Sequence, residues 1–371
     1  MIRVLHMIGG LNIGGSQSMV MNLYRKIDRN KIQFDFIIDH QDELYYEKEI
    51  KELGGRIYYI PAFNGLNLLS LIKNWNSFFK EHPEYKILHS HIRSYASLYL
   101  PIAKRNGVIT IIHSHSTSNS TGLKKYAKTI LQFPLRYQAN YFFACSQTSG
   151  EWLYGKKTTK KSNYYILKNS IDASKYRFNM SNRNKTRKEL NVDETCELYG
   201  HIGRFHESKN YPFLLKLFNA IHLKNKNTKL VLLGDGELKK DIKKIIRSYN
   251  LNDCVILLGF KENIDLYLQA FDYFLFPSLW EGLPVSLVEA QASGLPCLVS
   301  NTITKEVDIT PTIHFLPINK GISPWLTKLD EITSTRIDTY QLIIDSGFDI
   351  THNVKWISDF YKKCYEESRY L

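Results

Sequence analysis

The sequence predicts an α/β protein made of two doubly wound domains. Its length of 371 residues exceeds what one hydrophobic core usually serves, so two domains are expected. In both halves, short β-rich apolar runs alternate with segments of helical period, a pattern typical of parallel sheets covered by helices. A polar stretch at residues 169–194 has no strong apolar period and separates the two halves.

The first half, residues 1–172, is expected to form one Rossmann-like domain. Segments of helical period lie at residues 18–27 and 68–82. Strands are predicted, in chain order, at IRVLHMI (2–8), FDFIID (34–39), RIYYIPA (56–62), KILHSH (86–91), VITIIHSH (108–115) and YFFACS (141–146).

The second half repeats the pattern over residues 195–352, after a predicted linker at residues 173–194. A last helix, from about residue 353 to 371, follows the final strands. The helices expected between strands are FLLKLFNAIHLKN (213–225) and LKKDIKKIIRSYN (238–250). The expected strands are ELYGHIGR (197–204), KLVLLGDG (229–236), VILLGF (255–260), YFLFPS (273–278) and PCLVS (296–300).

Composition restricts the class of protein. Apolar residues make up 43% of the chain and charged residues 23%, which is typical of a soluble globular enzyme. No run of about 18 apolar residues is present, so no membrane-spanning helix is expected. The start, MIRVLHMIGG, lacks a small-residue cleavage pattern and predicts a strand instead of a signal peptide. The scattered cysteines predict free thiols of a cytoplasmic protein: Cys145, Cys196, Cys254, Cys297 and Cys364.

Positive charge is concentrated in the first half. Residues 1–170 hold 23 Lys and Arg against 11 Asp and Glu, whereas residues 171–371 hold 26 against 25. This asymmetry predicts that the N-terminal half meets something anionic: nucleic acid, a phosphorylated substrate or an anionic bilayer.

Candidate site residues lie where predicted strands end, because open α/β sheets bind ligands beyond the carboxyl ends of their strands. After the first strand, Gly14 and Gly15 precede an amphipathic helix, where backbone N–H groups and the helix dipole can receive a phosphate. An ordinary glycine-rich turn is the alternative. The spacing does not match the G-x-G-x-x-G dinucleotide fingerprint, and Asp39 alone favours a nicotinamide cofactor.

Histidines gather at two later strand ends, His89 and His91 in LHSHIRS and His113 and His115 in IIHSHSTSN. Residues i and i+2 of a strand share a face, so the geometry permits a metal site. The sequence shows no clear third ligand and no adjacent acid. Hydrogen bonding to a polar ligand is therefore the preferred interpretation, and no metal is predicted.

In the second half, Gly203 and Arg204 end a strand and Lys209 follows near a helix start. A guanidinium fork, an ammonium group and a helix N-terminus can together hold a diphosphate. A solvated basic loop is the alternative. Gly234 lies in LLGDGELKK, a tight turn that can also line a nucleotide.

Two carboxylates fall in WEGLPVSLVEAQASGLP. Glu281 lies in the loop before a helix, and Glu289 lies within that helix between apolar neighbours. A loop carboxylate can accept hydrogen bonds from sugar hydroxyls, and the second can accept from the two hydroxyls of a ribose. An acid in so apolar a helix needs a partner.

These motifs resemble family 4 of the retaining nucleotide-sugar glycosyltransferases, on the evidence of FPSLWEGLPVSLVEAQASGLP, GRFHESKN and the early GGSQ turn. The resemblance implies the GT-B fold, two Rossmann-like domains facing one another across a deep cleft. IIHSHSTSNS, RYQANYFFACSQTSGEWLYG and ILKNSIDASKYRFN are similar to the subgroup that builds bacterial capsular and exopolysaccharide repeat units.

The resemblance assigns the donor to the second half. Arg204 and Lys209 would bind the donor diphosphate without a metal, in agreement with the absence of a D-x-D sequence. Glu281 would hold the sugar and Glu289 the ribose. The nucleotide is expected to be UDP instead of GDP, because this subgroup mostly uses UDP. The remaining residues expected to line the donor are Gly14, Gly15, Gly203, Gly234, Gly282 and Leu283. The attack would occur on the front face of the sugar, with the leaving phosphate oxygen taking the acceptor's proton.

The first half would bind the acceptor, and the last helix, at about residues 353–371, would pack back on it. Gly15 would approach the phosphate, and His115, in preference to His113, would face the sugar or acceptor. Gln17 stands where the family often has Glu, which we expect to be a mild change. The acceptor of this subgroup is a saccharide on polyprenyl diphosphate, so LKKYAKTILQFPLR (123–136) and GKKTTKKS (155–162) are expected to rest on the anionic inner face of the plasma membrane.

Two alternative functions were considered. A nicotinamide-dependent oxidoreductase would explain two Rossmann-like halves, but it leaves Glu281 and Glu289 without a role. A nucleic-acid-binding protein would explain the basic half, but the sequence has no recognised reader motif. No nucleic-acid partner is therefore predicted.

Overall fold

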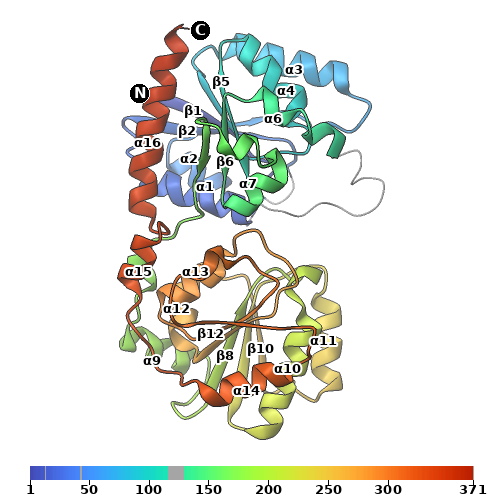
Figure 1. Cartoon of the computed structure of the whole chain (residues 1–371), viewed down its shortest axis with the longest axis vertical. Helices are drawn as coiled ribbons and strands as arrows, with labels where there is room; N and C mark the ends of the chain where they lie inside the picture. The colour runs from blue at the N-terminus through green and yellow to red at the C-terminus, as the bar shows by residue number, and fades with distance from the viewer. Residues whose placement is uncertain (13, 42–43, 116–128, 371) are drawn as a thin grey trace. The chain divides into compact units, whose positions relative to one another are not determined.

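The computed structural model describes residues 1–12, 14–41, 44–115 and 129–370 (Figure 1). The chain divides into two compact units. Unit 1 comprises residues 1–170 and returns at residue 350, and unit 2 comprises residues 171–349. Each unit contains one parallel sheet with helices on both faces, as the alternating pattern predicts.

The sheet of unit 1 has seven strands in the order β3-β2-β1-β4-β5-β6-β7. The order reverses between β1 and β4, which makes this point the switch position where doubly wound sheets bind ligands. The strands are β1 (Ile2–Met7), β2 (Ile32–Ile38), β3 (Ile57–Tyr59), β4 (Ile87–Ser90), β5 (Ile109–Ser114), β6 (Tyr141–Ala144) and β7 (Tyr164–Ile166).

Two apolar cores cover the faces of this sheet. One contains Phe34 and Tyr361, and it lies under α1 (Gly15–Lys26), α2 (Glu47–Glu52) and α16 (Ile350–Glu367). The other contains Trp75 and Tyr99. It lies under α3 (Leu68–Glu81), α4 (Ala96–Arg105), α6 (Leu135–Gln138) and α7 (Gln147–Tyr154), and short 3-10 turns follow at η1 (Thr158–Lys160) and η4 (Ser368–Tyr370).

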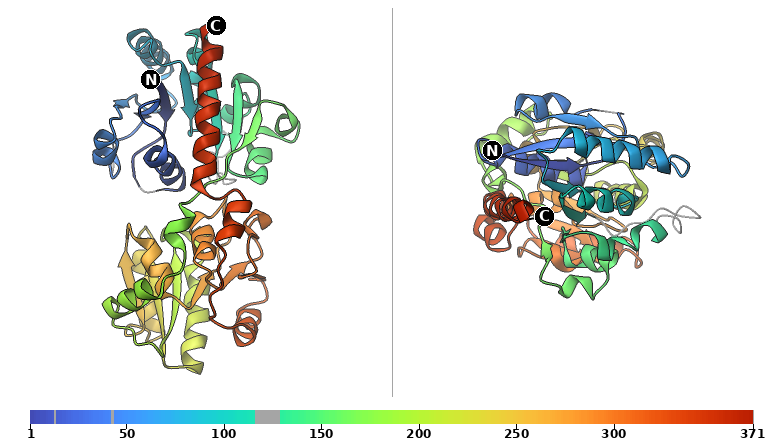
Figure 2. Two further views of the ribbon diagram at one scale, coloured as in Figure 1. Left: turned by 90° about the vertical axis from the view of Figure 1, so that its left-hand side faces the viewer. Right: turned by 90° about the horizontal axis from the view of Figure 1, so that it is seen from above.

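Helix α16 belongs to unit 1 although it follows unit 2 in the chain. Its buried residues Ile350, Ile357, Tyr361 and Cys364 recur at helical spacing and pack into the core with β1 and β2. Figure 2 shows the helix, in red, lying alongside the strands of this unit. Tyr361 consequently reaches the switch position between β1 and β4.

The sheet of unit 2 has six strands in the order β10-β9-β8-β11-β12-β13, and it reverses between β8 and β11. The strands are β8 (Glu197–Ile202), β9 (Thr228–Leu233), β10 (Val255–Gly259), β11 (Tyr273–Phe276), β12 (Cys297–Ser300) and β13 (Ile313–Leu316). The helices are α8 (Ala173–Tyr176), α9 (Met180–Glu189), α10 (Tyr211–Lys224), α11 (Lys239–Ser248), α12 (Ile264–Ala270), α13 (Val285–Ala292), α14 (Ser323–Glu331) and α15 (Tyr340–Asp345), with 3-10 turns η2 (Glu207–Lys209) and η3 (Lys305–Val307). Among the described helices, none is both long enough and apolar enough to cross a bilayer.

The structure corrects the prediction that residues 173–194 form a linker. This segment forms α8 and α9, which pack against α12 and belong to unit 2. Charged contacts hold α9 against unit 2, where most helices use an apolar face. Arg183 and Arg187 both bind the carboxylate of Asp272, at 2.6 and 3.1 Å. A pattern search for apolar period could not detect a helix held in this way.

Candidate functional site

Two predicted site residues meet at the switch position of unit 2. The Nζ atom of Lys209 lies 2.6 Å from the Oε1 atom of Glu281, and each side chain is only 14% exposed. Lys209 follows β8 and Glu281 follows β11, the two strands between which the order reverses. The sequence analysis predicts that Lys209 and Glu281 bind the same ligand, and they can do so only if their side chains lie close together.

Local structure fixes the direction of Lys209. It ends the 3-10 turn η2, where the His206 side chain accepts a hydrogen bond from the backbone N–H of Ser208. Asn210, in the left-handed conformation with φ of 55°, then starts α10. The ammonium group also lies 4.8 Å from the centre of the Phe276 ring, so it is held between an aromatic face and a carboxylate.

Gly203 and Gly234 allow two strand-end loops to approach closely. Gly234 has a φ of 141°, and a Cβ atom there would lie 2.0 Å from the carbonyl oxygen of Gly203. The backbone of β8 and β9 therefore meets directly beside Lys209. This contact requires glycine at position 234, whereas a Cβ atom on Gly203 would meet the side chain of Lys209 at 2.8 Å.

Arg204 is not part of the Lys209–Glu281 ion pair, and its side chain is far more exposed than those of the pair. Its Nε atom lies 3.4 Å from Glu237, in a pair whose side chains are 71% and 48% exposed. Such a pair contributes little stability, so the guanidinium group is not fixed by it. Gly282 and Leu283 connect Glu281 to α13, and Leu283 is buried.

Glu289 is buried in α13, with 7% of its surface exposed. The partner that the sequence analysis required is Tyr176 of α8, whose hydroxyl donates a 2.7 Å hydrogen bond to Oε1. Burial raises the pKa of Glu289 to about 7. Tyr176 lies 113 positions away, in the segment taken for a linker, and no sequence signal connects it with Glu289.

In unit 1, Gly14 caps α1 and Gly15 is its first residue. A Cβ atom on Gly15 would meet nothing within 4 Å, and one on Gly14 would meet only the flexible side chain of Gln17. Packing within the described chain therefore does not explain Gly15. Its backbone is open to the approach of a ligand.

The predicted histidines come together at the switch position of unit 1. His89 of β4, His113 of β5, and His91 and His115 directly after these strands form one group, which we call the histidine cluster. A fifth member, His6 of β1, was missed by the sequence analysis. The signal was available, because a reversal between β1 and β4 places the end of β1 beside LHSHIRS.

Hydrogen bonds join the histidine cluster. The pairs are His6 Nδ1 with His91 Nε2 at 3.0 Å, His91 Nδ1 with His115 Nε2 at 2.8 Å, His89 Nε2 with His113 Nδ1 at 3.2 Å, and His89 Nδ1 with the Tyr361 hydroxyl at 2.6 Å. Burial lowers the pKa of all five imidazoles, to about 3 for His6 and His115. His113 is fully buried and His115 partly exposed.

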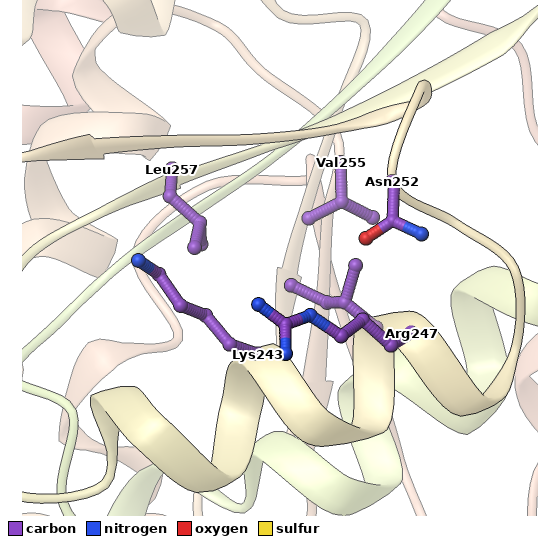
Figure 3. A pocket seen from close by; sticks show the side chains of 6 residues that line it. Lys243, Arg247, Asn252, Val255 and Leu257 are labelled. Carbon is purple, nitrogen blue, oxygen red and sulfur yellow. The ribbon is translucent and has the colours of Figure 1, made fainter.

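A surface groove of about 350 Å³ lies elsewhere on unit 2, between α11 and the edge strand β10 (Figure 3). Lys243 and Arg247 of α11 extend over Val255 and Leu257 of the strand. None of its lining residues is a predicted site residue. The groove is therefore distinct from the strand-end residues described above.

Two family profiles match the chain. The one described as Glycosyltransferase Family 4 matches residues 13–175, and the one described as Glycosyl transferases group 1 matches residues 182–309. Among characterised structures, that of HepE from Anabaena in complex with UDP-glucose has a TM-score of 0.78 at 16% identity, covering 98% of this chain and all of HepE. This likeness confirms the expected GT-B fold.

Relatives in sequence agree along nearly the whole chain. The protein named glycosyltransferase EpsF from Bacillus subtilis is 36% identical over 370 residues, 97% of this chain and 96% of the relative. An Escherichia coli enzyme named UDP-Gal:alpha-D-GlcNAc-diphosphoundecaprenol alpha-1,3-galactosyltransferase is 25% identical over 82% of this chain and 83% of its own. A capsular polysaccharide glycosyltransferase, CapH from Staphylococcus aureus, is 26% identical over 82% of both. The chain is therefore a glycosyltransferase and belongs to glycosyltransferase family 4.

Proposed function

We propose that this enzyme transfers a hexosyl or N-acetylhexosaminyl group from a UDP-sugar to a saccharide carried on polyprenyl diphosphate, with retention of configuration. The product would be a repeat unit of a capsular polysaccharide or exopolysaccharide. The E. coli relative, by its name, uses UDP-galactose and a diphosphoundecaprenol acceptor, and HepE binds UDP-glucose. Family membership favours this function over the oxidoreductase alternative.

The pairing of Lys209 with Glu281 is the observation that carries the proposal. A diphosphate needs a cation and a sugar needs a hydroxyl acceptor, and this pair offers both within 2.6 Å at a ligand-binding switch position. Both side chains are only 14% exposed, so neither is solvated as a surface residue would be. We therefore assign the donor's reacting bond to the neighbourhood of this pair.

The remaining donor residues take roles that follow from their surroundings. Arg204 is exposed and only weakly paired with Glu237, so its guanidinium group would turn to a phosphate, and Glu289 offers carboxylate oxygens to the ribose hydroxyls. Gly15 presents open backbone at the start of α1. Lys209 and Arg204 would neutralise the leaving diphosphate, so donor binding in unit 2 would need no divalent cation.

His115 is proposed to face the sugar or the acceptor. It lies at the end of β5 and is less buried than His113. The attacking hydroxyl would approach the front face of the sugar, and its proton would pass to the departing phosphate oxygen. No protein base is required for that step.

The membrane surface is the proposed location of the acceptor. Lys156, Lys157, Lys160 and Lys161 are all exposed around η1. The Nζ atom of Lys161 lies 5.9 Å from the ring of Tyr137, which is itself 69% exposed. Ammonium groups beside exposed aromatic rings suit an anionic lipid interface at the inner face of the plasma membrane, and we assign the excess charge to lipid in place of nucleic acid.

The second basic segment, residues 123–136, lies partly outside the described residues. Within its described part, Ile130 and Phe133 are 72% and 54% exposed. Exposed apolar side chains beside basic ones are what a peripheral membrane contact requires.

Calorimetric titration with UDP, GDP and NAD, each with and without EDTA, tests the proposed donor. UDP should bind at micromolar concentration and EDTA should not weaken it. Binding of NAD alone, or loss of UDP binding in EDTA, would contradict the proposal.

A further inference from the structure

The histidine cluster contains the third metal ligand that the sequence analysis did not find. Each H-x-H pair offers two imidazoles on one face of a strand, and a metal needs at least a third. Because β4 and β5 are adjacent, His91, directly after β4, lies against His115, directly after β5, at 2.8 Å between ring nitrogens. His113 lies on the same face as His115, and their rings stack at 4.1 Å.

The hydrogen bonds within the cluster are incomplete. Each imidazole has two ring nitrogens, and the Nε2 atoms of His6 and His113 and the Nδ1 atom of His115 are buried without a partner among the described residues. Burying a polar atom without a partner costs about 1–3 kcal/mol. A ligand that engages these imidazoles would remove part of that cost.

Three of the histidines are arranged to share one ion. One ring nitrogen from each of His91, His113 and His115 lies within 4.8 Å of the others. His91 uses Nε2 for His6 and His113 uses Nδ1 for His89, so Nδ1 and Nε2, respectively, remain for the ion. Tetrahedral ligands at about 2.05 Å from zinc stand roughly 3.4 Å apart, so the 2.8 Å between the His91 and His115 nitrogens needs to widen by about 0.6 Å.

The other two histidines occupy the positions of supporting groups. A metal-bound imidazole donates its second N–H to a nearby acceptor, which fixes its orientation. His6 Nδ1 can accept from His91 Nε2, at 3.0 Å, and His89 Nε2 can accept from His113 Nδ1, at 3.2 Å. His89 is held in turn by Tyr361 of α16. Each of the five histidines thereby has a role, and the ion would engage the unpartnered Nε2 atom of His113.

We propose that His91, His113 and His115 bind one zinc(II) ion in unit 1, with His6 and His89 as supporting partners and one coordination position left for an oxygen ligand. Three histidines with an open position are an established zinc coordination type. The site lies outside the donor residues of unit 2, and it leaves their metal-free assignment unchanged. It shares His115 with the proposed function, which places this residue beside the sugar or the acceptor, and it is otherwise independent of the proposed substrates.

Cobalt(II) is the probe that tests the site. The full chain, freed of metal with a chelator that is then removed, is titrated with cobalt(II) and afterwards with zinc(II). We expect about one cobalt ion per chain with the visible absorption of tetrahedral coordination, displaced by zinc. His113→Gln and His115→Gln should each remove that absorption, and His6→Gln should weaken binding about 10–100-fold.

His82→Gln is the matched control, because His82 belongs to unit 1 but lies at the end of α3, away from the cluster. Circular dichroism of each variant establishes that it is folded, and UDP titration establishes that unit 2 is intact. A folded wild-type chain that binds neither metal would overturn the proposal. So would a His115→Gln variant with unchanged cobalt affinity and spectrum. UDP binding is read separately, so failure of the metal site and failure of the proposed donor are distinguishable.

Discussion

The ammonium group of Lys209 lies 2.6 Å from the carboxylate of Glu281, although 72 positions separate the two residues in the chain. Each is proposed to bind a different part of the donor, one the diphosphate and the other the sugar. The two side chains neutralise one another directly. Recognition of the phosphate and of the sugar would therefore be coupled through this ion pair.

Glu281→Ala and Lys209→Ala should each reduce transfer by about 100-fold or more, because each removes a charged contact to the reacting donor. The fold should survive, since both residues lie outside the strands and long helices. Lys244→Ala is the matched control, an exposed lysine of α11 paired with Asp241. Sugar transfer from UDP-sugars is the assay, and wild-type turnover in either site variant would contradict the assignment.

UDP affinity should rise as the pH increases through about 7. The ionised form of Glu289 accepts hydrogen bonds from ribose hydroxyls, whereas burial raises the pKa of this carboxyl to about 7 and keeps it protonated below that. Calorimetry from pH 5.5 to 8.5 measures the effect. Glu289→Gln should bind weakly at every pH. In Tyr176→Phe the midpoint should move upward, because the Tyr176 hydrogen bond lowers the pKa. If the UDP affinity of the wild type did not change with pH, Glu289 would not be a ribose ligand.

The same carboxyl should affect stability in the opposite direction. Its pKa is higher in the folded chain than the ordinary 4.5, so the folded state holds a proton that the unfolded state has released. The free energy of unfolding should therefore fall as the pH rises from 4.5 to 7, by roughly 3 kcal/mol in all. Urea unfolding of the wild type and of Glu289→Gln across this range checks the prediction, and equal slopes for the two would contradict it.

Asp272→Ala should destabilise unit 2 by about 3–5 kcal/mol, because it leaves the buried Arg187 and its neighbour Arg183 without their carboxylate. Asp330→Ala is the control. Asp330 pairs with Lys224 at the surface, so its loss should cost about 1 kcal/mol or less. Urea midpoints measure both, and similar values for the two variants would show that α9 is not held by these arginines.

Gly234→Ala should cost more stability than Gly259→Ala. Both glycines have positive φ, but a Cβ atom at Gly259 meets nothing within 4 Å, whereas one at Gly234 meets the Gly203 carbonyl at 2.0 Å. Gly259→Ala should cost about 1 kcal/mol from backbone strain alone. Gly234→Ala must also displace the loop beside Lys209, so UDP affinity should fall. Equal thermal shifts and unchanged UDP binding would contradict this.

Neutralising Lys156, Lys157, Lys160 and Lys161 should weaken binding to anionic vesicles by roughly 1 kcal/mol for each lysine. UDP affinity should be unchanged, because these residues lie in unit 1 near η1. The matched control neutralises four exposed basic residues of α11, namely Lys240, Lys243, Lys244 and Arg247. Vesicle sedimentation compares the two sets. An equal loss of vesicle binding in both would show that net charge, and not this lysine segment, determines the binding.

The architecture was accessible from the sequence because strand and helix periods alternate within each half. The rule that ligands bind beyond strand ends then selected Lys209, Glu281 and His115 without knowledge of any contact. What the sequence could not show depends on pairing between distant segments. Tyr176 meets Glu289 across 113 positions, and Arg187 holds α9 through Asp272. Polar contacts of this kind leave no periodic pattern.

The position of α16 determines the order in which the chain can fold during synthesis. Unit 2 is continuous from residue 171 to 349, so it can fold as soon as it leaves the ribosome. Unit 1 begins first but must wait for Tyr361, which reaches back 272 positions to His89. Until then the core around Phe34 stays partly uncovered, and the nascent N-terminal half is the part that needs protection from aggregation.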